Sequence, residues 1–338
     1  MKQKLYFAPM EGITGYVFRN AFAACYGGVD TYFTPFISNP VLNQIEKHDV
    51  LPEHNEGLQV IPQILTNKAN IFRMIATTLK DYGYPEVNFN LGCPSGTVVA
   101  KGRGCGALRE PKELDRLLDG IFEVSPLPVS VKCRIGISSE VEWEDILEVL
   151  LKYPLTELTI HPRLQKEFYN GNVHPEAFRL AYDRILERKA AKPIRLCYNG
   201  DIRTPENLQK LLQEFPEIDA VMLGRGLLWN PELAEQCAPL LEGDGETILP
   251  ATPTGPEIEA STPTSRNTGY DRARFRRFLS LLFDGYKEEM DREGPALAKL
   301  KELWQYLMVY AGRSPKDMRP LWKTKTLAEY RDVVATLV

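Results

Sequence analysis

The segment Leu-Tyr-Phe-Ala-Pro-Met-Glu-Gly, residues 5–12, decides which α/β fold this sequence favours. Its first half has the apolar and aromatic character of a short buried strand, and its second half is a turn. A doubly wound dinucleotide-binding sheet places Gly-x-Gly-x-x-Gly after its first strand, but Pro9-Met10-Glu11-Gly12 stands there instead. The segment therefore favours another kind of α/β fold.

Runs similar to residues 5–8 recur along the chain and predict eight strands. The runs are Leu5–Ala8, Thr31–Thr34, Gln59–Pro62, Glu86–Phe89, Val129–Val131, Glu157–Ile160, Ile194–Tyr198 and Ala220–Leu223. Most are separated by stretches with helical apolar spacing, and Asn67 and Thr204-Pro205 look like helix starts. Eight strand–helix units in about 240 residues predict a (β/α)8 TIM barrel.

Composition divides the 338 residues into three expected regions. Residues 1–242 would form the barrel, the expected catalytic domain. Residues 243–269 are rich in Pro, Thr, Ser and Gly and predict a flexible linker, because they cannot bury enough apolar surface to pack. In residues 270–338, positions such as Phe275, Phe278 and Leu282 keep helical spacing and predict a small helical domain.

Charge and cysteine usage narrow the class of protein. Residues 270–338 hold 14 Lys and Arg against 10 Asp and Glu, although the whole chain carries −4. A basic tail suits a polyanionic partner, and a merely solvated helical surface fits equally well.

The six cysteines lack a Cys-x-x-Cys pair and the four histidines lack ligand spacing, so we expect no metal. Without an apolar leader or span of ~20 residues, we expect a cytoplasmic monomer with no membrane contact.

Two glycine-containing segments follow the last two predicted strands, at the barrel end where reactive groups gather. Asn199-Gly200-Asp201 and Gly224-Arg225-Gly226 supply backbone N–H groups that can face an anion, and Asn230-Pro231 is expected to begin the next helix. Ordinary tight turns after strands also use glycine. The pair of segments predicts a phosphate site at this end of the barrel.

Lys132 ends the run Pro-Val-Ser-Val-Lys within an otherwise apolar predicted strand. Its ammonium would reach the barrel mouth, where it could stabilise negative charge on a reduced flavin ring. A lysine that reaches solvent or pairs with a carboxylate is the alternative. Gln63 and His161 could hydrogen-bond the edge of such a ring, and Met10 could pack beneath its face.

Two cysteines compete for a chemical role. Cys93 follows the fourth predicted strand in an exposed Gly-Cys-Pro turn, whereas Cys105 lies in a glycine-rich loop whose basic neighbours could lower its pKa. A proton donor needs a thiol that stays protonated near neutral pH. Cys93 suits that role better, but the residues alone leave Cys105 open.

At this point an ordered set of motifs resembles the tRNA-dihydrouridine synthase family of bacterial type. The matching segments are Ala-Pro-Met-Glu-Gly (8–12), Asn-Leu-Gly-Cys-Pro (90–94), Gly-Arg-Gly-Cys-Gly-Ala-Leu (102–108), Val-Ser-Val-Lys-Cys-Arg-Ile-Gly (129–136), His-Pro-Arg (161–163), Tyr-Asn-Gly (169–171), Asn-Gly-Asp-Ile (199–202) and Gly-Arg-Gly (224–226). Gly-Arg-Gly alone is worthless as a signal. The whole set spans the predicted barrel in order and is highly specific.

The resemblance implies an FMN-dependent oxidoreductase that acts on a CH–CH bond, with NADPH or NADH as reductant. Hydride would pass from N5 of the flavin to C6 of a uridine flipped out of tRNA, and Cys93 would protonate C5 to give 5,6-dihydrouridine. The implied FMN contacts are Ala8, Pro9 and Met10 beside the ring, Gln63, Lys132 and His161 at its edges, and Asn199, Gly200, Asp201, Gly224 and Arg225 around the phosphate. The implied substrate contacts are Asn90, Lys101, Arg103, Arg134, Arg163 and Tyr169.

The same resemblance gives the basic tail a purpose, because the C-terminal helical domain of the family binds tRNA. The candidate phosphate contacts are Arg272, Arg274, Arg276, Arg277, Lys299, Lys301, Lys316, Arg319, Lys323 and Lys325. Three features depart from the family pattern: Gly96 replaces a common basic residue, Pro162 replaces a glycine, and the linker is long. The long linker leaves open how rigidly the two domains are held relative to one another.

Two other functions remain open from the sequence. A flavin barrel that reduces a free pyrimidine would not need the basic helical tail. A barrel that binds RNA without catalysis would be colourless. The sequence does not indicate which uridine would be reduced.

Overall fold

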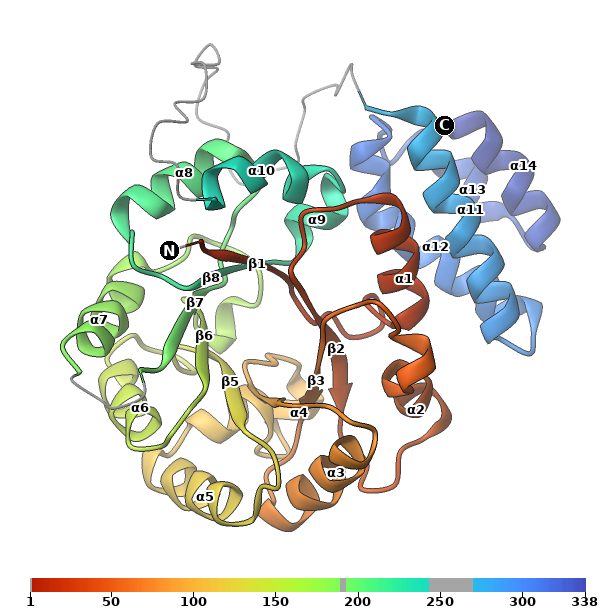
Figure 1. The fold of residues 1–338 in the computed structure, drawn as a ribbon. Coiled ribbons are helices and arrows are strands. Elements are labelled where there is room, and N and C mark those ends of the chain that lie inside the picture. The colour runs from red at the N-terminus through yellow and green to blue at the C-terminus, as the bar shows by residue number, and fades with distance from the viewer. Residues whose placement is uncertain (1, 189–192, 243–269) are drawn as a thin grey trace.

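The structure is a computed structural model that describes residues 2–188, 193–242 and 270–338. The expected linker, residues 243–269, lies outside the described residues. Eight parallel strands form a closed barrel in which each strand pairs with the next and β8 pairs with β1 (Figure 1). The strands are β1 (Lys4–Phe7), β2 (Thr31–Ile37), β3 (Val60–Ile64), β4 (Val87–Leu91), β5 (Val129–Arg134), β6 (Glu157–His161), β7 (Arg195–Tyr198) and β8 (Ala220–Leu223). The prediction of a TIM barrel with helices after it is confirmed.

Successive side chains along each strand point alternately to the outside and the inside of the barrel, which gives two apolar layers. In β1, Leu5 and Phe7 join the large core between strands and helices, whereas Tyr6 packs inside the barrel with residues such as Phe33 and Met222. Side chains on a strand point to opposite faces in turn, so a short run fills both layers. The Tyr6 hydroxyl donates to the buried Glu157 carboxylate at 2.9 Å, which satisfies a polar pair inside the barrel.

Helices surround the barrel on its outer side (Figure 1). They are α1 (Tyr16–Cys25), α2 (Gln44–Val50), α3 (Ala69–Asp81), α5 (Pro111–Val124), α6 (Glu142–Leu151), α7 (Pro175–Leu186), α8 (Pro205–Glu214), α9 (Arg225–Trp229) and α10 (Leu233–Leu241). The short helix α4 (Gly96–Val99) belongs to the loop after β4 and is drawn inside this ring of helices, over the barrel end (Figure 1). Short 3-10 helices are η1 (Pro52–His54), η2 (Gly104–Leu108) and η3 (Gln165–Glu167). Their buried faces follow the predicted apolar spacing, as Ile75 and Leu79 show in α3.

The helix start signals have different outcomes. Thr204 caps α8 as predicted, because its side chain accepts the N–H of Asn207 and Pro205 is the first helical residue. Asn67 does not cap α3, which begins at Ala69; its side-chain amide instead donates to the Lys101 carbonyl at 2.9 Å. The prediction for Asn67 was therefore wrong, because a contact distant in sequence takes its side chain.

Four helices follow residue 269 and pack beside α1 and α9 (Figure 1). They are α11 (Arg272–Glu289), α12 (Glu293–Tyr310), α13 (Arg319–Lys323) and α14 (Leu327–Leu337). Phe278 of α11 contacts the rings of Phe18, Phe22 and Tyr26 on or beside α1, with centroids 5.5–6.2 Å apart. These apolar contacts join the helices to the barrel in one core, a question that the sequence left open.

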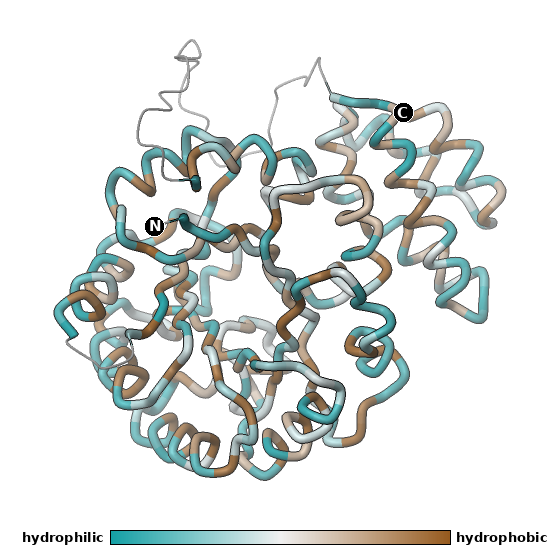
Figure 2. Tube along the Cα trace, in the orientation of Figure 1, coloured by the Kyte–Doolittle hydropathy of each residue, from teal (hydrophilic) through white to brown (hydrophobic). Residues whose placement is uncertain are grey.

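Polar contacts add to this interface. The hydroxyl of Tyr16 donates to Glu289 at 2.6 Å, and Nδ1 of His48 lies 2.9 Å from the same carboxylate. Arg274 pairs with Glu235 of α10. Apolar residues, brown in Figure 2, run through the helices on both sides of the interface. In the described part of the chain, no helix is long and apolar enough to cross a membrane.

Candidate active site

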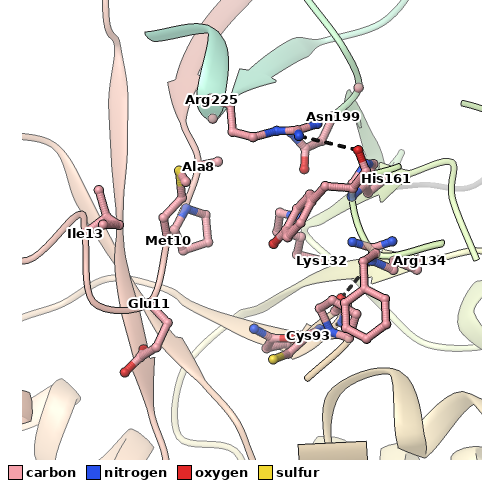
Figure 3. A pocket seen from close by; sticks show the side chains of 18 of the residues that line it. Ala8, Met10, Glu11, Ile13, Cys93, Lys132, Arg134, His161, Asn199 and Arg225 are labelled. Atoms are coloured by element: carbon pink, nitrogen blue, oxygen red, sulfur yellow. Dashed lines mark hydrogen bonds between the residues drawn. The ribbon is translucent and has the colours of Figure 1, made fainter. Parts of the chain in front are cut away.

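A cavity of about 520 Å³ opens at the carboxyl ends of the barrel strands. Every residue expected to contact a cofactor lines it, namely Ala8, Pro9, Met10, Gln63, Lys132, His161, Asn199, Gly200, Asp201, Gly224 and Arg225. Of the expected substrate contacts, Asn90, Arg134 and Tyr169 line the cavity and Lys101, Arg103 and Arg163 do not. Figure 3 shows Met10 across the cavity from Lys132, with Arg225 toward one end and Cys93 toward the other.

One end of the cavity is rich in positive charge. Arg225 contacts the Asp201 carboxylate at 3.1 Å, Arg163 pairs with the same carboxylate, and Arg203 lies near it. Burial alone would raise the pKa of Asp201, but the hydrogen bonds and charge of Arg163, with the charge of Arg225, lower it. Three guanidinium groups therefore face one ionised carboxylate, and the surplus positive charge suits a phosphate.

Glycine shapes the same end. A Cβ on Gly226 would lie 2.3 Å from the carbonyl oxygen of Ile202, so only glycine lets α9 pack this closely on the loop after β7. Gly224 is the N-cap of α9, which begins at Arg225. The helix expected to begin at Asn230-Pro231 is α10, which begins two residues later at Leu233, because Asn230 is the C-cap of α9. The backbone beside the cavity is thus the start of α9.

Lys132 extends from β5 into the cavity (Figure 3). Burial, together with the positive charge of Arg134, lowers the pKa of Lys132 to about 8. No carboxylate pairs with its ammonium among the residues that the structure describes. Of the two alternatives from the sequence, the ion pair is therefore not seen, and the partly exposed ammonium faces the open cavity.

His161 lies buried at the end of β6. Burial, followed by the charges of Arg134 and Lys132, holds the pKa of His161 well below its usual range, so its ring is neutral at pH 7. Nη1 of Arg163 lies 3.1 Å from Nε2 of His161. Because arginine only donates, Nε2 accepts and the ring proton must sit on Nδ1. The ring can therefore offer one N–H donor.

Arg163 itself is not a surface group. It is 1% exposed and, besides His161 and Asp201, it donates to the Gly171 carbonyl at 2.7 Å. These bonds hold His161 and the loop after β6 in place. The expected RNA contact at Arg163 does not fit this position, because the side chain is enclosed by the protein.

Asn90 fixes the turn that carries Cys93. Its Oδ1 accepts the N–H groups of Gly92 and Cys93, both at 2.9 Å, and its Nδ2 donates to Oε1 of Gln63 at 2.7 Å. Gln63 in turn donates to Asn88 at 2.8 Å. The sequence assigned Asn90 to substrate alone, but most of its hydrogen-bonding capacity is used to position this turn.

Arg134 holds the same turn from β5. Its Nε donates to the Gly92 carbonyl at 3.1 Å and its Nη1 to the Leu164 carbonyl at 3.0 Å. The Gln165 side chain adds a bond to the Pro94 carbonyl at 2.9 Å. Arg134 is only 1% exposed, so its expected contact with substrate is limited to the edge that faces the cavity. The turn is thus held from two neighbouring loops.

The two competing cysteines occupy different surroundings. Cys93 lines the cavity and is partly exposed, and burial raises the pKa of its thiol, so it stays protonated at neutral pH. Cys105 is fully buried, and burial raises its pKa to about 12. The basic neighbours expected to lower the pKa of Cys105 do not offset its loss of water. Of the two, Cys93 alone can meet a ligand in this cavity.

Several lining residues were not expected from the sequence. They are Glu11, Phe36, Phe168, Arg203, Trp229 and Tyr306. Tyr306 comes from α12, so the C-terminal helices contribute to the cavity wall, and no strand-end argument could have found it. Partial burial, with the Asp49 and Glu46 carboxylates nearby, raises the pKa of Glu11 to about 7. Glu11 lies within the segment 5–12, but its pKa is raised in part by carboxylates that are distant in sequence, so the segment alone could not predict it.

The basic residues expected to contact RNA fall into two groups. Arg274, Arg276, Lys299 and Lys301 bind protein acceptors; Lys299, for example, donates to the Gly12 carbonyl. In contrast, Arg272 and Arg277 of α11 are exposed, as are Lys316, Arg319, Lys323 and Lys325 in the segment that contains Trp322, which is 40% exposed. Cations beside an accessible aromatic ring suit a nucleic acid. Among the described residues, no group of three or more His, Cys, Asp or Glu is arranged to hold a metal.

Sequence comparisons match this chain to one family of known proteins. The family model described as dihydrouridine synthase matches residues 6–255. A probable tRNA-dihydrouridine synthase of Staphylococcus epidermidis is 30% identical over 228 residues, which cover 66% of this chain and 68% of that protein. Probable tRNA-dihydrouridine synthase 2 of Bacillus subtilis is 29% identical, covering 66% and 69%. Among solved structures, morphinone reductase matches with a TM-score of 0.48 and 13% identity, covering 69% of this chain and 85% of that one.

Proposed function

Because this chain belongs to the dihydrouridine synthase family, we propose that it reduces the C5–C6 double bond of uridines in tRNA to 5,6-dihydrouridine. FMN is the proposed cofactor and NADPH or NADH the proposed reductant. The observation that carries the proposal is one cavity that combines a protonated thiol, Cys93, with an anion-binding end at Asp201 and Arg225. A flavin phosphate requires the anion-binding end, and reduction of a pyrimidine ring requires the proton donor.

The residues of the cavity fit FMN. Arg225 and the backbone at Gly200 and Gly224 would hold the phosphate, where guanidinium groups outnumber carboxylates. The unpaired ammonium of Lys132 would neutralise charge at the ring edge. The Nδ1–H of neutral His161 would donate a hydrogen bond there. When bound and reduced, FMN supplies the hydride for C6 of the uracil.

Cys93 would deliver the proton to C5. A general acid must be protonated at working pH and held within hydrogen-bond reach of the atom that it protonates. The raised pKa supports the first requirement, and Asn90 and Arg134 support the second because they hold the turn that carries Cys93 at the cavity. The remaining N–H of Asn90 faces the same cavity and would bind the uracil edge.

The substrate must leave its base stack to enter the cavity. Extrusion of a base costs a few kcal/mol, which contacts to the rest of the RNA must offset. The exposed cations around Trp322 are the proposed phosphate contacts, with Lys101 and Arg103 as further candidates near the Cys93 loop. The names of the relatives also support tRNA as the partner.

The proposal is tested with the purified intact protein. Its flavin is identified after denaturation, and the protein is incubated with NADPH and tRNA that lacks dihydrouridine. Mass spectrometry of nucleosides then measures the product, with free uridine as the comparison substrate. We expect bound FMN and dihydrouridine in tRNA only. A colourless protein, or equal reduction of free uridine, would contradict the proposal.

A further inference from the structure

Phe168 occupies a backbone position that normally requires glycine. Its φ of 51° and ψ of −102° match the first central residue of a type II′ turn, and the Asn170 N–H closes that turn on the Glu167 carbonyl at 2.8 Å. Phe168 is the only non-glycine residue with positive φ in the described ranges. A large side chain here is strained, because its Cβ crowds the backbone.

The surrounding contacts keep this turn in its strained form. The Glu167 carboxylate accepts the Leu164 N–H at 2.7 Å and contacts Nε2 of His174 at 2.8 Å. Gln165 ties the same loop to Pro94, next to Cys93. Strain that neighbouring contacts maintain is concentrated at functional sites in proteins. The turn is therefore linked to the segment that carries the proposed acid.

The ring of Phe168 is only partly covered by the protein. It lines the cavity and is 43% exposed, and within the described residues no ring or cation stacks on it. The adjacent Tyr169 differs, because the guanidinium groups of Arg134 and Arg225 lie 5.3 and 4.9 Å from its ring centre. Tyr169 is also exposed, at 51%, but guanidinium groups already lie over its ring, whereas the described residues place none over Phe168.

We propose that Phe168 is a stacking platform for the tRNA base next to the uridine that enters the cavity. The inference rests on the proposed function and adds a specific RNA contact to it. Stacking on an aromatic side chain changes affinity by roughly five- to 150-fold per base. That gain offsets the loss of stacking when the uridine leaves its neighbour. A reductant that approaches from solution breaks no base stack, so a nicotinamide ring has no such loss to recover.

Phe168→Gly tests the proposal, because strain and function predict opposite effects. Relief of the positive φ should leave the melting temperature unchanged or raise it by a few degrees. Loss of the ring should raise the KM for tRNA about tenfold, with FMN content and the rate of flavin reduction by NADPH unchanged. Phe168→Trp keeps a stacking face and should restore the KM to within about threefold. Val41→Ala, at an exposed apolar residue outside the cavity, is the matched control.

Each result separates the proposals. A Phe168→Gly protein with the tRNA KM of the intact chain would overturn the inference. So would slow flavin reduction with normal tRNA kinetics, which would make the ring a nicotinamide contact. Unfolding of Phe168→Gly would mean that the ring is structural and would also overturn it. If the unaltered protein forms no dihydrouridine, the proposed function fails and the RNA contact fails with it.

Discussion

At the scale of single residues, surroundings rather than residue type separate Cys93 from the other thiols. Cys105, Cys133 and Cys197 are all fully buried, whereas Cys93 reaches the cavity. The sequence predicted that Cys93 follows a strand, but it did not show that Cys105 is buried. The role of Cys93 as the acid stays a prediction that substitution can test.

Cys93→Ala should stop product formation without removing the cofactor. The variant should bind FMN and accept electrons from NADPH, while dihydrouridine formation falls by about 10²- to 10⁴-fold, the usual worth of a positioned acid. Nucleoside mass spectrometry and flavin absorbance measure the two steps separately. Cys105→Ala is the matched control and should lose only stability, because its thiol is buried. Normal turnover in Cys93→Ala, or a dead Cys105→Ala, would contradict the assignment.

Lys132 should cost the flavin-free protein stability in a pH-dependent way. Its pKa is about 8 in the folded state against 10.5 ordinarily, so the unfolded chain holds this proton more tightly than the folded one. The stability that Lys132 contributes is therefore fully present above pH 10.5, and it is lost as the pH falls through 8. Lys132→Met should therefore raise the free energy of unfolding by on the order of 1–3 kcal/mol at pH 7. The gain should shrink at pH 9.5, while turnover falls. Urea unfolding of both flavin-free proteins at the two pH values checks the difference; an equal gain at both values would refute the assignment.

At the scale of elements, strand positions followed from short apolar runs because both faces of a barrel strand are buried. All eight predicted runs overlap observed strands, and Ala220–Leu223 has the same bounds in both. Helix ends were less predictable. Thr204 and Asn67 are both good capping residues, and only the folded chain shows that Asn67 bonds to Lys101.

The two expected caps make a matched pair for mutation. Thr204→Ala removes the acceptor of the Asn207 N–H and should lower the free energy of unfolding by about 1 kcal/mol. Asn67→Ala removes one exposed hydrogen bond that caps no helix and should cost less than about 0.5 kcal/mol. Thermal or urea unfolding measures both. An equal loss of unfolding free energy in the two variants would mean that the Thr204 cap stabilises the protein no more than an ordinary exposed hydrogen bond.

At the scale of the whole molecule, the charge asymmetry was visible in the sequence but the docking of the last four helices was not. Helical spacing showed that Phe278 would be buried, without showing that its partners are Phe18 and Phe22 of α1. Deletion of residues 270–338 would expose those rings and remove Tyr306 from the cavity. Charge substitutions therefore test RNA binding more cleanly than truncation.

Arg319→Gln combined with Lys323→Gln should weaken tRNA binding without affecting the flavin. Both side chains are exposed beside Trp322, and each lost phosphate contact should lower the slope of log affinity against log salt by about 0.7–0.9. Filter binding of tRNA at several salt concentrations measures the slope, and NADPH-dependent flavin reduction should not change. Lys80→Gln combined with Lys210→Gln, exposed on α3 and α8, removes the same charge elsewhere. An equal effect of both pairs would indicate general electrostatics only.

The aromatic contact between α1 and α11 also bears on how the chain is synthesised. Phe22 and Phe278 are separated by roughly 250 residues, which a ribosome adds in on the order of 10–50 s. During that interval the apolar face of α1 has been made and its partner has not. The growing chain therefore exposes these aromatic side chains until α11 has been synthesised, so a chaperone that shields Phe18 and Phe22 would increase the yield of folded protein.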